Sequence, residues 1–176
     1  GRSGRECRSF AEPFMTAPFV VFAVGNPSRG DDAIGPVICG RLEKWLENEG
    51  LADQFELIED FQLQIEHAMD LQGRRLALFI DAGAGTPAPY TFERIAPSEA
   101  VAHTTHELPP EAVLQVYLQT EGMAPPPAFV LCVRGERFEL GEPLTAAAVS
   151  YVEVAFGLLT RLSGQPTLVE WERAAL

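Results

Sequence analysis

Basic residues are scarce in this chain: 13 Lys and Arg stand against 25 Asp and Glu, and the formal net charge is −12. Proteins that bind nucleic acid neutralise phosphates with clustered Lys and Arg side chains. The charge balance therefore argues against a nucleic-acid partner.

Cysteines and long apolar runs are also scarce. Cys7, Cys39 and Cys132 form neither a disulfide framework nor a CxxC pair, so we expect Cys39 and Cys132 to be buried free thiols.

No run approaches the roughly 18 apolar residues of a membrane span, and the N-terminal segment lacks the apolar stretch of a secretory signal. We therefore expect a cytoplasmic protein with no membrane partner, and a monomer. Residues 1–15 are expected to be a disordered extension, and residues 16–176 to form one domain.

Nearly half of the residues, 47%, are hydrophobic, which is enough for a sizeable core. Short apolar runs predict buried strands at residues 19–24, 55–59, 76–81 and 128–133, and a weaker pattern at 90–95 indicates an edge strand. Helical spacing predicts helices at residues 33–48 and 65–72, a third that begins at Pro110, and a last one capped at Thr145. This alternation predicts an α/β fold: a three-layer sandwich with a mostly parallel, twisted sheet of about five strands and helices on both faces.

Two aspartates and one histidine lie at positions where the sheet would bring them together. Asp32 lies in the loop after the first strand, Asp81 closes the strand at 76–81, and His106 lies in a polar segment further on. The carboxyl ends of parallel strands form the edge where ligands bind. Two carboxylates and an imidazole at that edge would make a three-ligand site for a transition metal, with positions left open.

Each of these residues also has a simpler interpretation. Asp32 could cap the first helix, and Asp81 could form a turn into the glycine-rich loop that follows it. His106 could be a packed or solvent-facing histidine, and His103, three residues earlier, could be the ligand in its place.

The loop after the first strand does not match a nucleotide site. Gly25, Gly30 and Gly35 fit neither the dinucleotide fingerprint nor the P-loop, and the carboxylates of Asp31 and Asp32 would repel a phosphate at a helix N-terminus. The chain also has no Gly-x-Ser-x-Gly nucleophile motif and no HExxH zinc motif. We expect no tightly bound organic cofactor.

With these residues identified, the chain resembles the [NiFe]-hydrogenase maturation endopeptidases over roughly residues 21–162. The resemblance rests on the strand followed by Gly25-Asn26, a short loop, the acidic pair Asp31-Asp32 and a helix, and on Asp81 and the segment Thr104-Thr105-His106-Glu107-Leu108. It implies that Asp32, Asp81 and His106 bind the metal, and that Asp32 and Asp81 are catalytic. Candidate substrate-binding residues are Asn26, Gln62, Gln64 and His67. His67 could instead be a fourth ligand, a general base or a packing residue.

The resemblance implies an aspartic-type endopeptidase that removes the C-terminal extension of the hydrogenase large-subunit precursor after nickel insertion. Nickel is then recognised in the substrate. Asp32 departs from the family, which usually has glutamate there. The segment 60–67 is similar to the subgroup that serves soluble NAD(P)-linked bidirectional hydrogenases.

Two alternatives remain. One is a nickel checkpoint or chaperone that binds the precursor without cutting it. The other is a peptidyl-tRNA hydrolase-like esterase, suggested by Gly25-Asn26-Pro27 but disfavoured by the negative charge and by the lack of a catalytic His-Asn pair after that loop.

Overall fold

The computed structural model describes residues 16–99 and 108–176. Its centre is one open sheet of five strands in the order β2-β1-β3-β5-β4. The strands are β1 (Phe19–Val24), β2 (Phe55–Asp60), β3 (Leu76–Gly83), β4 (Tyr90–Ile95) and β5 (Ala128–Arg134). All pairs are parallel except β4 with β5, so the predicted mostly parallel sheet is confirmed and the weak strand at 90–95 is an edge strand.

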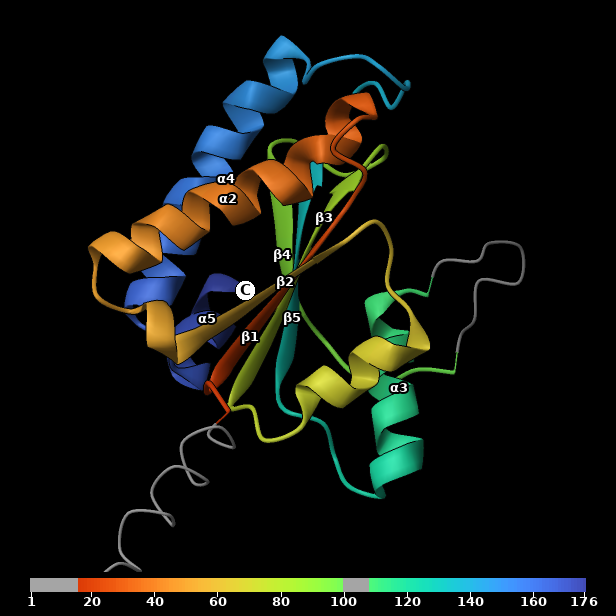
Figure 1. The fold of residues 1–176 in the computed structure, drawn as a ribbon, viewed down its shortest axis with the longest axis vertical. Helices are drawn as coiled ribbons and strands as arrows, with labels where there is room; N and C mark the ends of the chain where they lie inside the picture. Colours follow the sequence, from red (N-terminus) through yellow and green to blue (C-terminus); the bar gives the residue numbers. More distant parts are fainter. Residues whose placement is uncertain (1–15, 100–107) are drawn as a thin grey trace, which may run out of the picture.

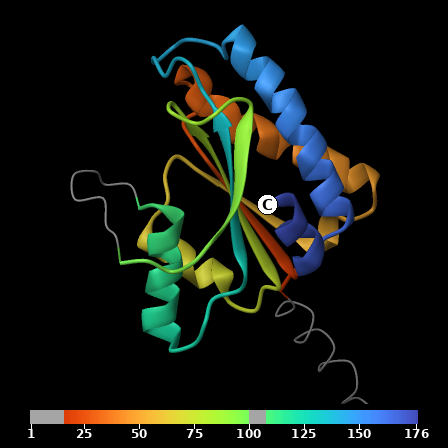
Figure 2. The ribbon, with the colours of Figure 1, turned by 180° about the vertical axis from the view of Figure 1, so that it is seen from behind.

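Helical segments lie on both faces of this sheet (Figures 1 and 2). One face is covered by α2 (Ile34–Asn48), α4 (Ala146–Gly164) and α5 (Leu168–Ala174), and the other by the 3-10 helix η4 (Ile65–Leu71) and α3 (Pro110–Glu121). Two further 3-10 helices, η2 (Gly30–Ala33) and η3 (Ala52–Gln54), precede α2 and β2. The three-layer α/β prediction is therefore confirmed, while the helix expected at 65–72 is a 3-10 helix.

The core is divided between the two faces because successive side chains of a strand point to opposite sides. Val21, Leu78 and Phe129 pack with the α2, α4 and α5 layer. Val20, Phe22 and Phe79 pack with the η4 and α3 layer, and the rings of Phe22 and Phe79 are stacked with centroids 4.7 Å apart. Every residue of β1 is buried, as expected for a strand covered on both faces.

Helix α4 is long and apolar enough to cross a membrane by length and composition, with a mean hydropathy of 1.2. Its residues Ala148, Val152, Ala155 and Leu159 are buried in the core beside α2 and the sheet. A core helix of a soluble protein passes the same test, so this helix has a sufficient explanation in the fold. Its N-terminus is as predicted, because the Thr145 side chain accepts a hydrogen bond from the Ala148 N–H.

Candidate functional site at the carboxyl edge of the sheet

The register of the strands brings acidic residues to one edge. Val24, the last residue of β1, pairs with Asp60 at the end of β2. On the other side of β1, Ala23 pairs with Ile80, so the next residue of β3, Asp81, lies beside Val24. Adjacent strands are about 4.8 Å apart. Asp60 and Asp81 therefore flank the end of β1, where the chain enters the loop that bears Asp32.

Gly25 determines how this loop leaves β1. Its φ of 146° is one that other residues rarely adopt, and a Cβ added there would lie 2.0 Å from the carbonyl oxygen of Asp32. Its N–H donates to the carbonyl oxygen of Asp60 at 3.0 Å. The absence of a side chain at Gly25 therefore allows η2 to fold back against the end of β1.

The Asp32 carboxylate does not cap the helix. Its Oδ2 accepts a hydrogen bond of 2.7 Å from the N–H of Asn26, six residues earlier in the chain. Helix α2 has Ala33 as its N-cap residue and no side-chain cap. The helix-cap interpretation of Asp32 is therefore wrong, because its carboxylate accepts from the loop N–H of Asn26 and Ala33 takes the N-cap position. The carboxylate, which is half-buried, is held at the edge of the sheet.

The preceding residue, Asp31, has a different environment and is fully buried. Its carboxylate accepts hydrogen bonds from the N–H groups of Glu136, Arg137 and Thr145 at 2.7, 3.2 and 2.8 Å, and from the Thr145 hydroxyl at 2.8 Å. Burial raises the pKa of Asp31, but the hydrogen bonds from Glu136, Thr145 and Arg137 together outweigh it, so the pKa lies below its ordinary value. Asp31 thus joins η2 to the chain after β5 and to the start of α4.

Sequence reasoning missed this role of Asp31. The one sequence signal was the Gly141-to-Thr145 segment that leads into the last helix, but nothing local shows that an acidic residue more than 100 positions earlier accepts its N–H groups.

Asp81 is partly exposed near the end of β3, and its Oδ1 accepts a hydrogen bond of 2.7 Å from the N–H of Ala82. The turn η2 packs directly against β3, so Asp32 and Asp81 lie on neighbouring elements of the same edge. His106 and His103 lie outside the described residues. Among residues 16–99 and 108–176, no group of three His, Cys, Asp or Glu side chains is arranged to hold a metal. The three-ligand set that includes His106 therefore stays a prediction.

His67 has a defined structural environment. It is buried in η4; its Nδ1 accepts the N–H of Gln64 at 2.8 Å, and its Nε2 lies 3.4 Å from Oδ2 of Asp60. Its ring meets Phe22 edge to face at a centroid distance of 5.8 Å. Both ring nitrogens therefore have polar neighbours, and the ring packs against Phe22. These contacts give His67 a structural role in capping η4 and in packing. Its role toward a substrate stays a prediction, as do those of Asn26, Gln62 and Gln64.

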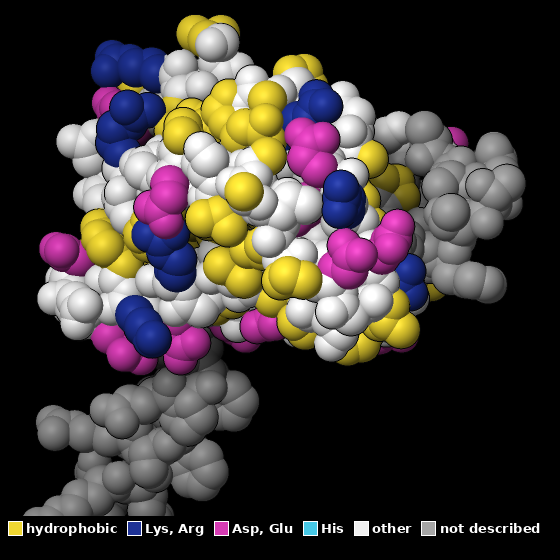
Figure 3. Space-filling model, turned by 90° about the horizontal axis from the view of Figure 1, so that it is seen from above, with side chains coloured by type: hydrophobic (Ala, Val, Ile, Leu, Met, Phe, Trp, Pro, Cys, Tyr) yellow, Lys and Arg dark blue, Asp and Glu magenta, His cyan; other side chains and the backbone are white. Residues whose placement is uncertain are grey.

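The segment that follows β2 exposes large apolar side chains. Phe61 and Ile65 are each 61% exposed, and Met69 is 77% exposed. Seen from above, the molecule shows hydrophobic side chains near the middle of the view, with acidic and basic side chains around them (Figure 3). Exposed apolar groups of this size are typical of surfaces that bind other proteins.

The described cysteines are unsuited to nucleophilic chemistry. Cys132 pairs with Asp81 in the sheet, and its Sγ lies 3.0 Å from the Thr86 hydroxyl. Burial, with a smaller effect from Asp81, raises the pKa of Cys132 although the Thr86 hydroxyl lowers it. Burial, together with Glu59 and Glu43, raises the pKa of Cys39 to about 11. A reactive cysteine needs a lowered pKa, so neither thiol is an activated nucleophile. Cys39 is buried as predicted, whereas Cys132 is only partly buried.

The fold and this edge together define a three-layer α/β protein with its candidate site at the carboxyl ends of β1 and β3. No protein-family model and no curated protein matches the sequence, whereas solved structures match the fold. The hydrogenase maturating endopeptidase HybD from E. coli is 25% identical, with a TM-score of 0.62 over 86% of this chain and 94% of that chain.

Two further matches carry related names. The [NiFe] hydrogenase maturation protease HycI from Thermococcus kodakarensis is 20% identical, with a TM-score of 0.62 over 86% of this chain and 95% of that one. A hydrogenase 2 maturation peptidase from a Thaumarchaeota archaeon is 19% identical, with a TM-score of 0.58 over 83% and 97%. The resemblance to the hydrogenase maturation endopeptidases is therefore confirmed, while the subgroup for NAD(P)-linked hydrogenases stays a prediction.

Proposed function

We propose that this protein is an endopeptidase that removes the C-terminal extension of a [NiFe]-hydrogenase large-subunit precursor after nickel has been inserted. The observation that carries the proposal is the placement of Asp32 and Asp81 on neighbouring elements at the carboxyl edge of a sheet with this fold. Solved structures with the same fold are named as hydrogenase maturation endopeptidases and proteases.

The different environments of the two neighbouring aspartates support a site at Asp32. Asp31 is fully buried and accepts four hydrogen bonds from the protein, so it has a structural role. Asp32 is half-buried. Within the described residues, its carboxylate accepts one hydrogen bond, from the N–H of Asn26. A carboxylate held in place but not enclosed is suited to receive a cation, since carboxylate oxygens are common ligands of divalent metals.

In this proposal the nickel of the precursor is part of the substrate. It docks on Asp32, Asp81 and His106, and the docked metal positions the scissile peptide bond near the two carboxylates. The metal could then polarise the peptide carbonyl or the attacking water. A carboxylate could instead take the proton of the water as a general base, which would make the enzyme aspartic in type. In either route specificity and catalysis depend on one interaction, because only a loaded precursor brings the metal.

The rest of the surface is consistent with a protein substrate. Phe61, Ile65 and Met69 provide exposed apolar area in the segment that follows β2. The net charge of −12 favours a protein partner over a nucleic acid, so the peptidyl-tRNA hydrolase alternative remains disfavoured. We place this reaction in the cytoplasm and expect the enzyme to act as a monomer.

Incubation of the purified protein with the nickel-loaded precursor separates the protease from the chaperone alternative. We expect a large subunit shortened at its C-terminus, detected by intact mass spectrometry. A stable complex with no change in mass would indicate a nickel checkpoint instead. Replacing each histidine in turn tests the ligand assignment: His106→Ala should abolish cleavage and His103→Ala should not.

A further inference from the structure

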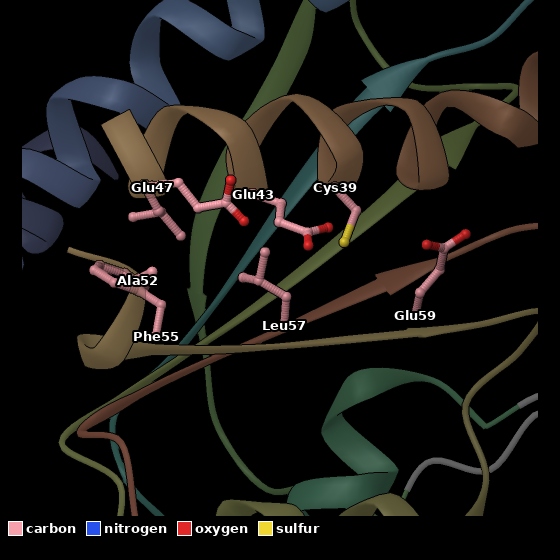
Figure 4. A pocket seen from close by; sticks show the side chains of 8 residues that line it. Cys39, Glu43, Glu47, Ala52, Phe55, Leu57 and Glu59 are labelled. Carbon is pink, nitrogen blue, oxygen red and sulfur yellow. The ribbon is translucent and has the colours of Figure 1, made fainter. Parts of the chain in front are cut away.

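The edge strand β2 borders a cavity that the proposed reaction does not use. The cavity has a volume of about 320 Å³ and lies between α2 and β2. Its walls include the carboxylates of Glu43 and Glu47 from α2 and of Glu59 from β2, and its apolar lining includes Phe55 and Leu57 (Figure 4). The cavity is thus apolar at its base and acidic at its rim.

Within residues 16–99 and 108–176, no strand pairs with the outer side of β2. β2 is the last strand at its end of the sheet, so its only described strand partner is β1. The carbonyl oxygen of Asp60 accepts a hydrogen bond from the N–H of Gly25, the residue that follows β1. Because backbone groups alternate in direction along a strand, those of Glu56, Ile58 and Asp60 face β1. The N–H and C=O groups of Leu57 and Glu59 therefore point away from the sheet.

The open backbone groups and the cavity belong to the same residues. Leu57 and Glu59, whose backbone groups point outward, both contribute side chains to the cavity. An extended peptide paired with β2 would direct every second side chain to the face covered by α2. On one face of such a pair, neighbouring side chains lie about 5 Å apart. Such a side chain would therefore reach the cavity between Glu43 and Glu59.

The acidic side chains of the cavity favour a positively charged side chain in the bound peptide. Among the ion pairs recorded for the described residues, none involves Glu43, Glu47 or Glu59. The negative field of Glu59 and Glu43 reaches Cys39, whose thiol pKa is raised by them in addition to burial. A Lys or Arg side chain fits this cavity, because its apolar stem can pack on Leu57 while its charged end meets the carboxylates. A second copy of the chain is disfavoured, because two β2 edges would bring acidic side chains together.

We propose that β2 and this acidic cavity bind an extended segment of the large-subunit precursor through strand pairing, with a Lys or Arg side chain of that segment in the cavity. The identity of the occupant rests on the function proposed above. Strand addition to an open edge is a common mode of peptide recognition, in which backbone pairing gives affinity and side-chain pockets give specificity. Because β2 ends at Asp60, beside the loop that bears Asp32, a segment bound along it leads to the candidate site.

Cleavage kinetics with the nickel-loaded precursor test this proposal. The double variant Glu43→Gln/Glu59→Gln should raise KM by about tenfold and leave kcat unchanged, because it removes the cation partners but not the reacting groups. Added salt should raise KM for the wild type, and less so for the double variant. Glu49→Gln, at the residue that follows α2 and outside the cavity, should leave KM unchanged.

A proline tests the backbone pairing separately. Glu59→Pro removes the outward N–H without breaking the ladder to β1, a change that edge strands tolerate. It should raise KM beyond the effect of Glu59→Ala, which keeps the N–H. Circular dichroism establishes that both variants fold. A KM unchanged by the double variant and by the proline would overturn the docking site.

The same variants separate this proposal from the proposed function. If the wild type binds the precursor without cutting it, Kd replaces KM as the measured quantity. A Kd raised in the double variant and in Glu59→Pro would then support the docking site while the protease assignment fails. If the wild type cuts the precursor and no variant changes KM, the docking site fails alone. If the wild type shows no affinity for the precursor, both proposals fail.

Discussion

The N–H of Asn26 and the carboxylate of Asp32 are joined by a hydrogen bond of 2.7 Å across a six-residue loop. This contact holds Asp32 at the end of β1, next to β3, which bears Asp81. This hydrogen bond matters for the proposed site, because the ligands of a metal carried by the substrate must be held in place before the substrate binds.

Asp32→Ala should abolish processing of the nickel-loaded precursor, with a loss of at least about 100-fold, as is common when a group that acts on the reacting atoms is removed. The free energy of unfolding should change by no more than about 1 kcal/mol, since one hydrogen bond is lost. Asp32→Glu should keep activity, because the family resemblance gives glutamate at this position. Product formation by mass spectrometry and urea denaturation measure the two effects. A large loss of stability in Asp32→Ala would mean that Asp32 is structural.

Gly25→Ala should damage the site through the backbone. The added Cβ would lie 2.0 Å from the carbonyl oxygen of Asp32, and the φ of 146° is unfavourable for alanine. We expect a destabilisation of about 2 kcal/mol or more together with loss of processing. Gly85→Ala is the control, since a Cβ there would meet no atom within 4 Å. Equal behaviour of the two variants in denaturation and cleavage assays would contradict the role given to Gly25.

Asp31→Asn should destabilise the protein by about 2–4 kcal/mol at pH 7, because hydrogen bonds to a charged group are replaced by poorer ones. The pKa of Asp31 is lowered in the folded state, so its contribution is complete above the unfolded value of about 4 and is lost as the pH falls through the folded value. The stability difference between wild type and variant should therefore shrink below pH 4. Urea denaturation at several pH values measures it, with the exposed Asp53→Asn as control. A difference that is constant with pH would show that the charge does not matter.

His67→Ala should lower stability by about 1–3 kcal/mol, since the ring is buried, accepts the Gln64 N–H and lies beside Asp60. Processing by the folded variant should stay within about fivefold of the wild type if this residue is structural. A loss of kcat as large as that of Asp32→Ala would instead make His67 a ligand or a base. A rise in KM alone would make it a substrate-binding residue.

The local pattern of apolar and turn-forming residues along the sequence was sufficient to predict most of the fold. The runs Phe19–Val24 and Tyr90–Ile95 were predicted with the bounds that the structure has, because turn-forming residues flank apolar or alternating segments there. The beginning of α2 was predicted one residue too early, since the 3-10 turn η2 precedes it. A 3-10 turn has the same apolar pattern as the start of an α-helix over so few residues.

The site was predicted less completely because its contacts are long-range. The sequence indicated that Asp32 follows the first strand and that Asp81 lies at the end of another; the register places the end of β1 beside Asp81, and η2, which bears Asp32, packs against β3. It gave no indication of the structural role of Asp31, because the partners of Asp31 lie at Glu136, Arg137 and Thr145. It also could not reveal the cavity beside β2, which exists only once β2 becomes the edge of the sheet.

The most direct test of the account compares cleavage of the same precursor with and without nickel. The purified enzyme is mixed with each form, and the mass of the large subunit is followed over time. Because the proposed docking needs the nickel of the precursor to bind Asp32 and Asp81, we expect a shortened product from the loaded precursor and no cleavage of the empty one. Cleavage of both forms at comparable rates would contradict the docking of substrate nickel on Asp32 and Asp81.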